Sequence, residues 1–240
     1  MPDLTGKVAV VTGSTKGIGR SVAEHLAAAG ASVVVTGRNQ ADADEVAAAI
    51  DKAADGSVVG MACNVRDADE CQKLIDDTVA RFGRLDILVN NAGLGIFRPI
   101  TELTVEEFHA QIETNLNGVF YLSKASVSHL SETEDGWIIN IGSLASRNTF
   151  AGGTGYNASK FGLLGMTEAT MLDVRDKDVR VSIIMPGSVN TAFWLREQQA
   201  ERTWRLEGDD CAMAVMQLLS YPKEAHVSRI EMRPSQPGKA

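Results

Sequence analysis

The stretch Thr12-Gly13-Ser14-Thr15-Lys16-Gly17-Ile18-Gly19 decides the fold. It follows a β-branched run, Lys7–Thr12, and precedes an Ala-rich amphipathic window over residues 17–29. A glycine-rich turn between a strand and a helix presents backbone N–H groups and the positive end of the helix dipole to an anion. The sequence therefore predicts a pyrophosphate-binding turn made of Gly13, Ser14, Thr15, Lys16, Gly17, Ile18 and Gly19.

The glycine spacing of this turn does not identify the ligand. It reads GxxxGxG, whereas the usual dinucleotide fingerprint is GxGxxG. No Gly-Lys-Ser/Thr follows, so the turn is not a Walker loop. A glycine-rich turn that binds nothing is the alternative at this point.

Around this turn, short β-branched runs alternate with helical windows along the whole chain. The expected strands are Lys7–Thr12, Ser32–Thr36, Val58–Ala62, Asp86–Asn90, Trp137–Ile141, Val179–Met185 and Val227–Met232. The expected helices lie near 17–29, 40–53, 67–82, 104–130, 157–176 and 209–220. Apolar runs that do not alternate suit strands covered on both faces. This pattern predicts an α/β fold, a Rossmann-like doubly wound sheet of about seven mostly parallel strands with helices on both faces.

Local signals refine this outline. Thr104-Val105-Glu106-Glu107 has capping-box spacing, so a helix should begin just after Thr104. Gly30 should end the first helix. No Pro/Gly/Ser-rich linker divides the chain, which predicts one domain over residues 1–240 with a short substrate lid at about 188–208. Phe193, Trp194, Leu195 and Trp204 in that lid suit an apolar substrate or the packing of the lid itself.

Composition excludes several classes of protein. The 240 residues are 44% hydrophobic and 22% charged, which is ordinary for a globular protein and not for a disordered one. The net charge of −8 disfavours nucleic-acid binding. Three cysteines without a CxxC pair, and four histidines without zinc-ligand spacing, predict a reducing compartment and no metal site. Without a signal peptide or a run of 18 apolar residues, we expect a cytoplasmic protein that does not bind membranes.

The residue after the second expected strand indicates the cofactor. An acidic side chain there would bind the ribose 2′-OH of NAD. The strand instead ends Thr36-Gly37-Arg38, and Lys16 adds a second cation from the glycine-rich turn. Two solvated surface cations are the plainer alternative, but a planar guanidinium suits a 2′-phosphate. The sequence therefore favours NADP(H).

Three polar side chains are candidates for chemistry. Tyr156 and Lys160 are four residues apart, which places them on one face of a helix. A cation near a phenol favours the phenolate, so Lys160 is expected to lower the pKa of Tyr156. Ser143 lies just past the fifth expected strand, where ligand sites of parallel sheets form. On this evidence alone, a chance pair is the favoured interpretation, because Tyr-x-x-x-Lys pairs occur on many helices.

Taken in order, the motifs resemble a known family. They are Thr12-Gly13-x-x-x-Gly17-Ile18-Gly19, Asn90-Asn91-Ala92-Gly93, Asn115, Ser143, Tyr156-x-x-x-Lys160 and Pro186-Gly187, spread over about residues 5–195. Jointly they resemble the short-chain dehydrogenase/reductase family in its compact form. The resemblance implies an oxidoreductase that moves a hydride between NADP(H) and a carbonyl or secondary alcohol.

The same resemblance implies roles for single residues. Tyr156 would be the general acid/base, and Ser143 would orient the substrate oxygen. Lys160 would hold the nicotinamide ribose, and the backbone of Asn115 would anchor a water of a proton relay. Cofactor contacts are further implied for Arg38, Asn64, Val65, Asn91, Ala92, Gly93, Pro186, Gly187, Val189 and Thr191. Asn64 stands where the family often has Asp, a change that an amide can tolerate.

Three further expectations concern partners and alternatives. The family resemblance implies a homodimer or homotetramer, built on the helices that hold Gly118 and Gly162. A 3-oxoacyl-acyl-carrier-protein reductase is the enzymatic alternative, with Arg98 and Arg147 as the only nearby basic residues for a carrier. A catalytically silent nucleotide-sensing regulator is the alternative from another class. Such a regulator would not need the Tyr156–Lys160 pair.

Overall fold

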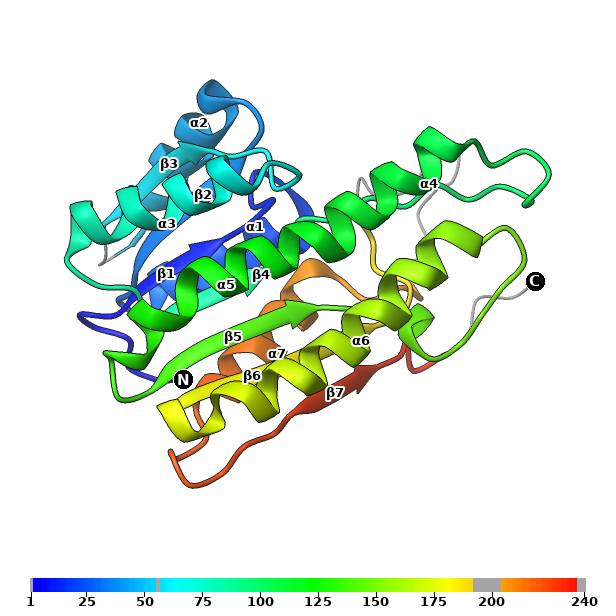
Figure 1. Cartoon of the computed structure of the whole chain (residues 1–240). Helices are drawn as coiled ribbons and strands as arrows, with labels where there is room; N and C mark the ends of the chain where they lie inside the picture. Colours follow the sequence, from blue (N-terminus) through cyan, green and yellow to red (C-terminus); the bar gives the residue numbers. More distant parts are fainter. Residues whose placement is uncertain (1, 55–56, 192–203, 237–240) are drawn as a thin grey trace.

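One parallel sheet of seven strands forms the centre of the computed structural model, which describes residues 2–54, 57–191 and 204–236 (Figure 1). The strand order is β3-β2-β1-β4-β5-β6-β7, and every pairing is parallel. The strands are β1 (Val8–Val11), β2 (Ser32–Gly37), β3 (Val58–Ala62), β4 (Ile87–Asn90), β5 (Gly136–Ile141), β6 (Val179–Pro186) and β7 (Arg229–Met232). The predicted doubly wound α/β fold is confirmed.

Helices cover both faces of this sheet, as the alternation of strands and helices predicted (Figure 1). They are α1 (Gly17–Ala28), α2 (Gln40–Asp51), α3 (Ala68–Phe82), α4 (Val105–Ile112), α5 (Gly118–Ser131), α6 (Thr154–Val174) and α7 (Gly208–Leu219). Buried side chains of α1, α2 and α7 belong to one core cluster, and those of α3 and α5 to another. A smaller cluster joins α5 and α6 to β6.

Alternating strand residues supply the two main cores. On β1, Val10 packs into the cluster under α3 and α5, whereas Ala9 and Val11 pack into the cluster under α1 and α7. All three are fully buried. Burying one valine side chain in this way contributes about 1.5–3 kcal/mol. The continuous apolar run of each strand is therefore explained by two covered faces.

The expected helix boundaries hold in part. The Thr104 hydroxyl and the Glu107 carboxylate form the predicted capping box of α4. Gly30, at φ +92°, follows the end of α1 as predicted. The single helix expected over 104–130 is wrong in its middle, because a π-helical turn, Glu113–Asn117, separates α4 from α5. Such turns widen the helix locally and often occur at functional sites.

The direction in which successive strands are added to the sheet reverses between β1 and β4. The connections from β1 lead outward to β2 and β3, whereas β4, β5, β6 and β7 continue on the other side. In open parallel sheets, a crevice for ligands forms at the carboxyl ends of the strands at this reversal. The segments that follow β1, β4, β5 and β6 carry most of the predicted site residues.

Candidate active site

The glycine-rich turn has the geometry that its sequence predicts. Gly13 and Gly17 have φ values of +61° and +58°, in the region that favours glycine. A Cβ atom on Gly13 would lie 2.9 Å from the Cα atom of Ala92, so only glycine fits against the segment after β4. The N-cap of α1, Lys16, supplies no side-chain hydrogen bond, and the first turn holds no acidic residue. This helix end suits an anionic ligand.

Thr12 joins this turn to the segment after β4. Its Oγ1 accepts hydrogen bonds from the backbone N–H groups of Asn91 and Ala92, both at 3.0 Å. In return, Asn91 Nδ2 donates to the carbonyl oxygens of Thr12, at 2.9 Å, and Gly13, at 3.1 Å. The hydroxyl of Thr12 is a functional group that the sequence reasoning did not single out. Its position next to Gly13 was the only signal for it.

The two predicted cations lie at the same end of the sheet. Arg38 follows the last residue of β2, Gly37, and both Arg38 and Lys16 are exposed. A Cβ atom on Gly37 would lie 2.8 Å from Thr15 Cγ2, so the end of β2 touches the glycine-rich turn. An anionic group bound near Thr15 would therefore lie within the field of both cations.

Asn64 and Val65 follow β3 on the same side. The Asn64 N–H donates to Glu70 at 2.8 Å, and the Asn64 side-chain oxygen accepts from the Arg66 N–H at 3.3 Å. Val65 is buried, and its carbonyl oxygen accepts from the Cys71 thiol at 3.5 Å. The Asn64 amide thus shapes a turn, a use that an aspartate at this position would also allow.

The segment after β6 returns toward the glycine-rich turn. Pro186 ends β6, and the Gly187 N–H donates to the Met232 carbonyl oxygen at 2.8 Å. Val189 is buried. A Cβ atom on Gly17 would lie 3.3 Å from the Thr191 methyl group, so Thr191 lies next to the turn.

The predicted lid lies mostly outside the described residues. Phe193, Trp194 and Leu195 are all outside them, and Trp204 is described as half-buried.

The structure also brings Ser143, Tyr156 and Lys160 together. Ser143 follows β5, and its hydroxyl forms a hydrogen bond with the Tyr156 phenol and accepts one from the Ala145 N–H at 3.1 Å. Lys160, one turn further along α6, has its Nζ 5.8 Å from the centre of the Tyr156 ring. The same Nζ donates to the Ile141 carbonyl oxygen at 2.9 Å. The Tyr-x-x-x-Lys pair is therefore part of a cluster and not a chance pair on a surface helix.

Burial controls the protonation of this cluster. Burial raises the pKa of the Tyr156 phenol, and the hydrogen bond with Ser143 opposes that rise. The prediction that the Tyr156 pKa is lowered is therefore wrong in its net direction, because burial disfavours the charged phenolate. Burial also lowers the pKa of Lys160 to about 8. Near neutral pH, Tyr156 is a protonated phenol beside a lysine that is still mostly charged.

Asn115 lies in the π-helical turn and is fully buried. Its side chain accepts from the Leu94 N–H at 2.7 Å and donates to the Leu94 carbonyl oxygen at 2.7 Å. It also donates to the Ser159 hydroxyl at 2.9 Å, and Ser159 in turn donates to the Tyr156 carbonyl oxygen at 2.8 Å. Asn115 thus connects the segment after β4 to the N-terminal part of α6. Ser159 was missed, although its place just before Lys160 was a signal.

Within the described ranges, no three His, Cys, Asp or Glu side chains gather closely enough to hold a metal ion. The helices of that same part of the chain include none whose length and apolar character would let it cross a membrane.

Comparisons with known proteins agree with this arrangement. The profile of the family described as short chain dehydrogenase matches residues 7–202. An uncharacterized oxidoreductase of Staphylococcus saprophyticus is 35% identical over 98% of this chain and 100% of its own. A metagenomic short-chain oxidoreductase, solved in complex with NADP, has a TM-score of 0.86 at 33% identity, over 98% of this chain and 100% of its own.

A second solved structure is an alcohol dehydrogenase from the archaeon Thermococcus sibiricus, complexed with 5-hydroxy-NADP. It has a TM-score of 0.88 at 30% identity, and the match covers 98% of this chain and 99% of that one. These likenesses extend over nearly the whole length of both partners, and for the two solved structures they include the fold. The chain belongs to the short-chain dehydrogenase family of oxidoreductases.

Proposed function

We propose that this protein uses NADP(H) to interconvert a carbonyl compound and the corresponding secondary alcohol. The observation that carries the proposal is the cluster of Ser143, Tyr156 and Lys160 at the carboxyl end of β5, beside a glycine-rich turn suited to an anion. The solved relatives that contain NADP or 5-hydroxy-NADP support the choice of cofactor.

The residues present fit such a dinucleotide. The positive φ values of Gly13 and Gly17 form the tight turn at the N-terminus of α1, where backbone N–H groups would bind the pyrophosphate. Arg38 and Lys16 would meet the 2′-phosphate with positive charge. The adenine would lie near Asn64 and Val65, and the nicotinamide side near Asn91, Ala92, Gly93, Pro186, Gly187, Val189 and Thr191. When bound, the nicotinamide supplies or accepts the hydride.

Tyr156 is the group that moves the proton in this proposal. Its phenol is protonated because burial raises its pKa, so it can donate a proton to the oxygen of a carbonyl substrate during reduction. The Ser143 hydroxyl, already bonded to the phenol, would hold the same substrate oxygen. The charged Lys160 would then stabilise the phenolate that remains, because the low-dielectric interior strengthens their attraction. Lys160 would also bind the nicotinamide ribose.

The two alternatives have less support. Arg98 and Arg147, the basic residues for an acyl-carrier partner, form ion pairs with Glu107 at 2.9 Å and Glu231 at 2.5 Å. Glu107 offsets the charge of Arg98, and Glu231 is shared by Arg147 and Arg233, so these ion pairs leave one net positive charge, which is little for an acidic carrier. A regulator that only senses nucleotide would not require a buried lysine one turn from a buried phenol.

We also propose that the protein is a cytoplasmic homodimer or homotetramer. On α6, Phe161, Gly165 and Leu172 are exposed at helical spacing, and Phe120 is exposed on α5. The two helices lie side by side on one face of the molecule (Figure 1). A Cβ atom on Gly165 would meet nothing within 4 Å, so a second copy could approach there. Gly118 and Gly162, in contrast, lie against Val65 and Leu116 of the same chain.

A cofactor and substrate panel tests the proposed activity. The protein is mixed with NADPH or NADH and with aryl ketones, alkyl ketones, sugars, steroids and acyl thioesters, and the nicotinamide absorbance is followed. We expect turnover of at least one ketone and a preference for NADPH. Equal efficiency with both cofactors would contradict the role of Arg38, and no turnover of any carbonyl would contradict the activity.

A further inference from the structure

Gln111 is a fully buried amide on α4 that the mechanism above does not use. It lies four residues before Asn115 and four after Glu107. Residues at this spacing lie on one face of a helix. All three side chains contact the same short segment, the residues that follow the Asn90–Gly93 motif.

The three hydrogen bonds recur at regular intervals along both segments. Asn115 accepts from the Leu94 N–H at 2.7 Å, Gln111 accepts from the Ile96 N–H at 3.0 Å, and Glu107 accepts from the Arg98 side chain at 2.9 Å. Two backbone N–H groups and one side chain of residues 94–98 are thus bound by α4 and by the π-helical turn that follows it. The hydrogen bond at Ile96 fixes the backbone directly before Phe97.

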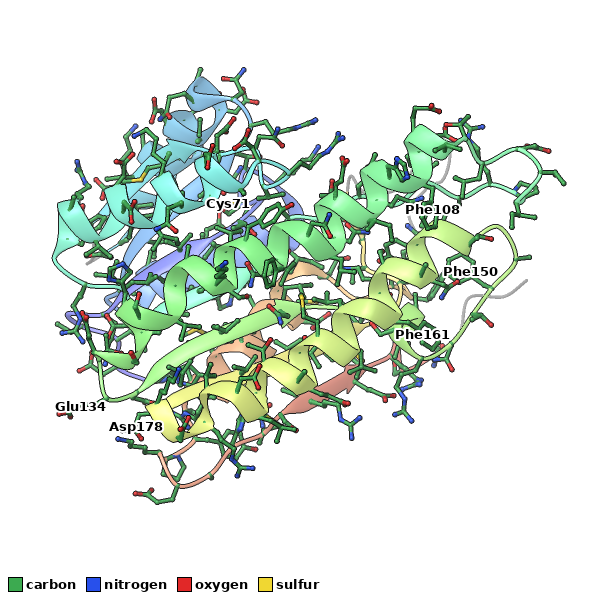
Figure 2. All side chains as sticks on the ribbon, viewed as in Figure 1. Cys71, Phe108, Glu134, Phe150, Phe161 and Asp178 are labelled. Carbon is green, nitrogen blue, oxygen red and sulfur yellow. The ribbon has the colours of Figure 1, made fainter. Side chains whose placement is uncertain are left out.

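Phe97 faces the reacting group. Its ring lies 5.4 Å from the Tyr156 ring in an edge-to-face arrangement, and 5.6 Å from the ring of Phe150. Phe150 is exposed and lies near the N-terminal end of α6 (Figure 2). The phenol that would protonate the substrate is thus bordered by aromatic surface on one side.

The Gln111 amide also touches α6 itself. Its Nε2 donates to the Glu107 carbonyl oxygen at 3.4 Å. A methyl group on Gly155, the residue before Tyr156, would overlap the same nitrogen. One buried side chain therefore lies between the segment that carries Phe97 and the turn of α6 that carries Tyr156.

We propose that Gln111 is a positioning residue that sets the substrate preference of the site. By holding Ile96, it keeps Phe97 beside Tyr156 and favours carbonyl compounds with an aryl or bulky apolar substituent over small alkyl ketones. Aromatic surface that is already in position binds such a group without first losing the entropy of a mobile segment. This inference rests on the proposed reductase activity.

The test is the substitution Gln111→Met, which keeps the length and volume of the side chain and removes its polar atoms. Gln217→Met, at an exposed position of α7, is the matched control. The assay measures kcat/KM with NADPH for acetophenone and for 2-butanone. We expect Gln111→Met to lower the ratio of the two values by about fivefold, the usual scale for one lost hydrogen bond. The control should leave the ratio unchanged, and NADPH affinity should be the same in both variants.

A double-mutant cycle separates positioning from general damage to the fold. Phe97→Ala should lower the same ratio, and adding Gln111→Met to it should lower the ratio little further, because both changes act through Phe97. Additive effects, or an equal loss for both ketones, would show that Gln111 only supports the fold. An unchanged ratio in Phe97→Ala overturns the inference even where Gln111→Met does not fold.

Hydrogen exchange gives a readout that needs no turnover. In the wild-type protein the Ile96 amide should exchange slowly, and Gln111→Met should speed its exchange while leaving α7 unaffected. A rapidly exchanging Ile96 amide in the wild type overturns the inference. Wild-type protein that reduces neither ketone contradicts the proposed function and the substrate preference together, whereas turnover with an unchanged ratio in Gln111→Met contradicts the inference alone.

Discussion

Replacing Thr12 by valine should damage both stability and cofactor binding. The change keeps the shape of the side chain but removes Oγ1, which accepts two backbone N–H groups at 3.0 Å each, from Asn91 and Ala92. Thr12 itself is only 1% exposed. Leaving a buried donor without an acceptor costs about 1–3 kcal/mol. Both donors here are half-buried, so the lower end applies, and the sum is about 2 kcal/mol.

Thr12→Ser is the matched control, because it keeps the accepting oxygen and loses only a methyl group, about 0.8 kcal/mol. Urea unfolding should place the free energy of unfolding in the order wild type, Thr12→Ser, Thr12→Val. The expected fall in Tm for Thr12→Val is roughly 4–8 °C for a chain of this size. Only Thr12→Val should also weaken NADPH binding, since Asn91 and Ala92 border the glycine-rich turn. Equal stability and equal NADPH affinity of the two variants would refute this reasoning.

Three further outcomes are expected. Arg38→Asp should lower the preference for NADPH over NADH by roughly tenfold or more, because one charge-assisted contact to a phosphate contributes about that much to affinity. Steady-state kinetics with both cofactors measure the preference, and an unchanged value would exclude Arg38 from the contact. Burial lowers the pKa of Lys160 from 10.5 to about 8 in the folded protein. Between pH 8 and pH 10.5, Lys160 is therefore protonated in the unfolded chain and mostly neutral in the folded one. The free energy of unfolding of the wild type, relative to that of Lys160→Met, should rise with pH across that window. Denaturant unfolding at pH 7 and pH 10 measures this difference, and a constant value would contradict it. Leu172→Lys, on the exposed face of α6, should reduce the mass found by light scattering toward the 25.7 kDa of one chain, and a wild type already at that mass would contradict the proposed oligomer.

Most of the fold could be predicted from local sequence. Continuous apolar runs require strands with two covered faces, and their alternation with helices leaves few topologies. The capping box at Thr104 and the stop at Gly30 are local signals that need no tertiary contact. The π-helical turn at Glu113–Asn117 had no such signal. Its residues also suit an α-helix, and in the structure Asn115 there bonds to the distant Leu94.

The positions of the site residues were predictable where a motif fixes their spacing. The properties that depend on burial or on contacts distant in the sequence were not. The spacing of Tyr156 and Lys160 placed the two on one face of α6, as the structure has them. The direction of the Tyr156 pKa shift depends on how much water the fold excludes, which spacing does not report. Gln111 was missed because its partner, Ile96, is fifteen positions away in the sequence and offers only a backbone N–H. Only the regular interval from Glu107 to Asn115 indicated a shared helix face.

The rate of NADPH-dependent ketone reduction by Tyr156→Phe tests the central claim most directly. The substitution keeps the ring against Phe97 and removes only the hydroxyl that would deliver the proton. The account predicts that kcat falls by about 10²–10⁴-fold, the usual contribution of general acid catalysis, while NADPH binds with unchanged affinity. A Tyr156→Phe protein that reduces the same ketone at close to the wild-type rate would contradict the claim that Tyr156 moves the proton.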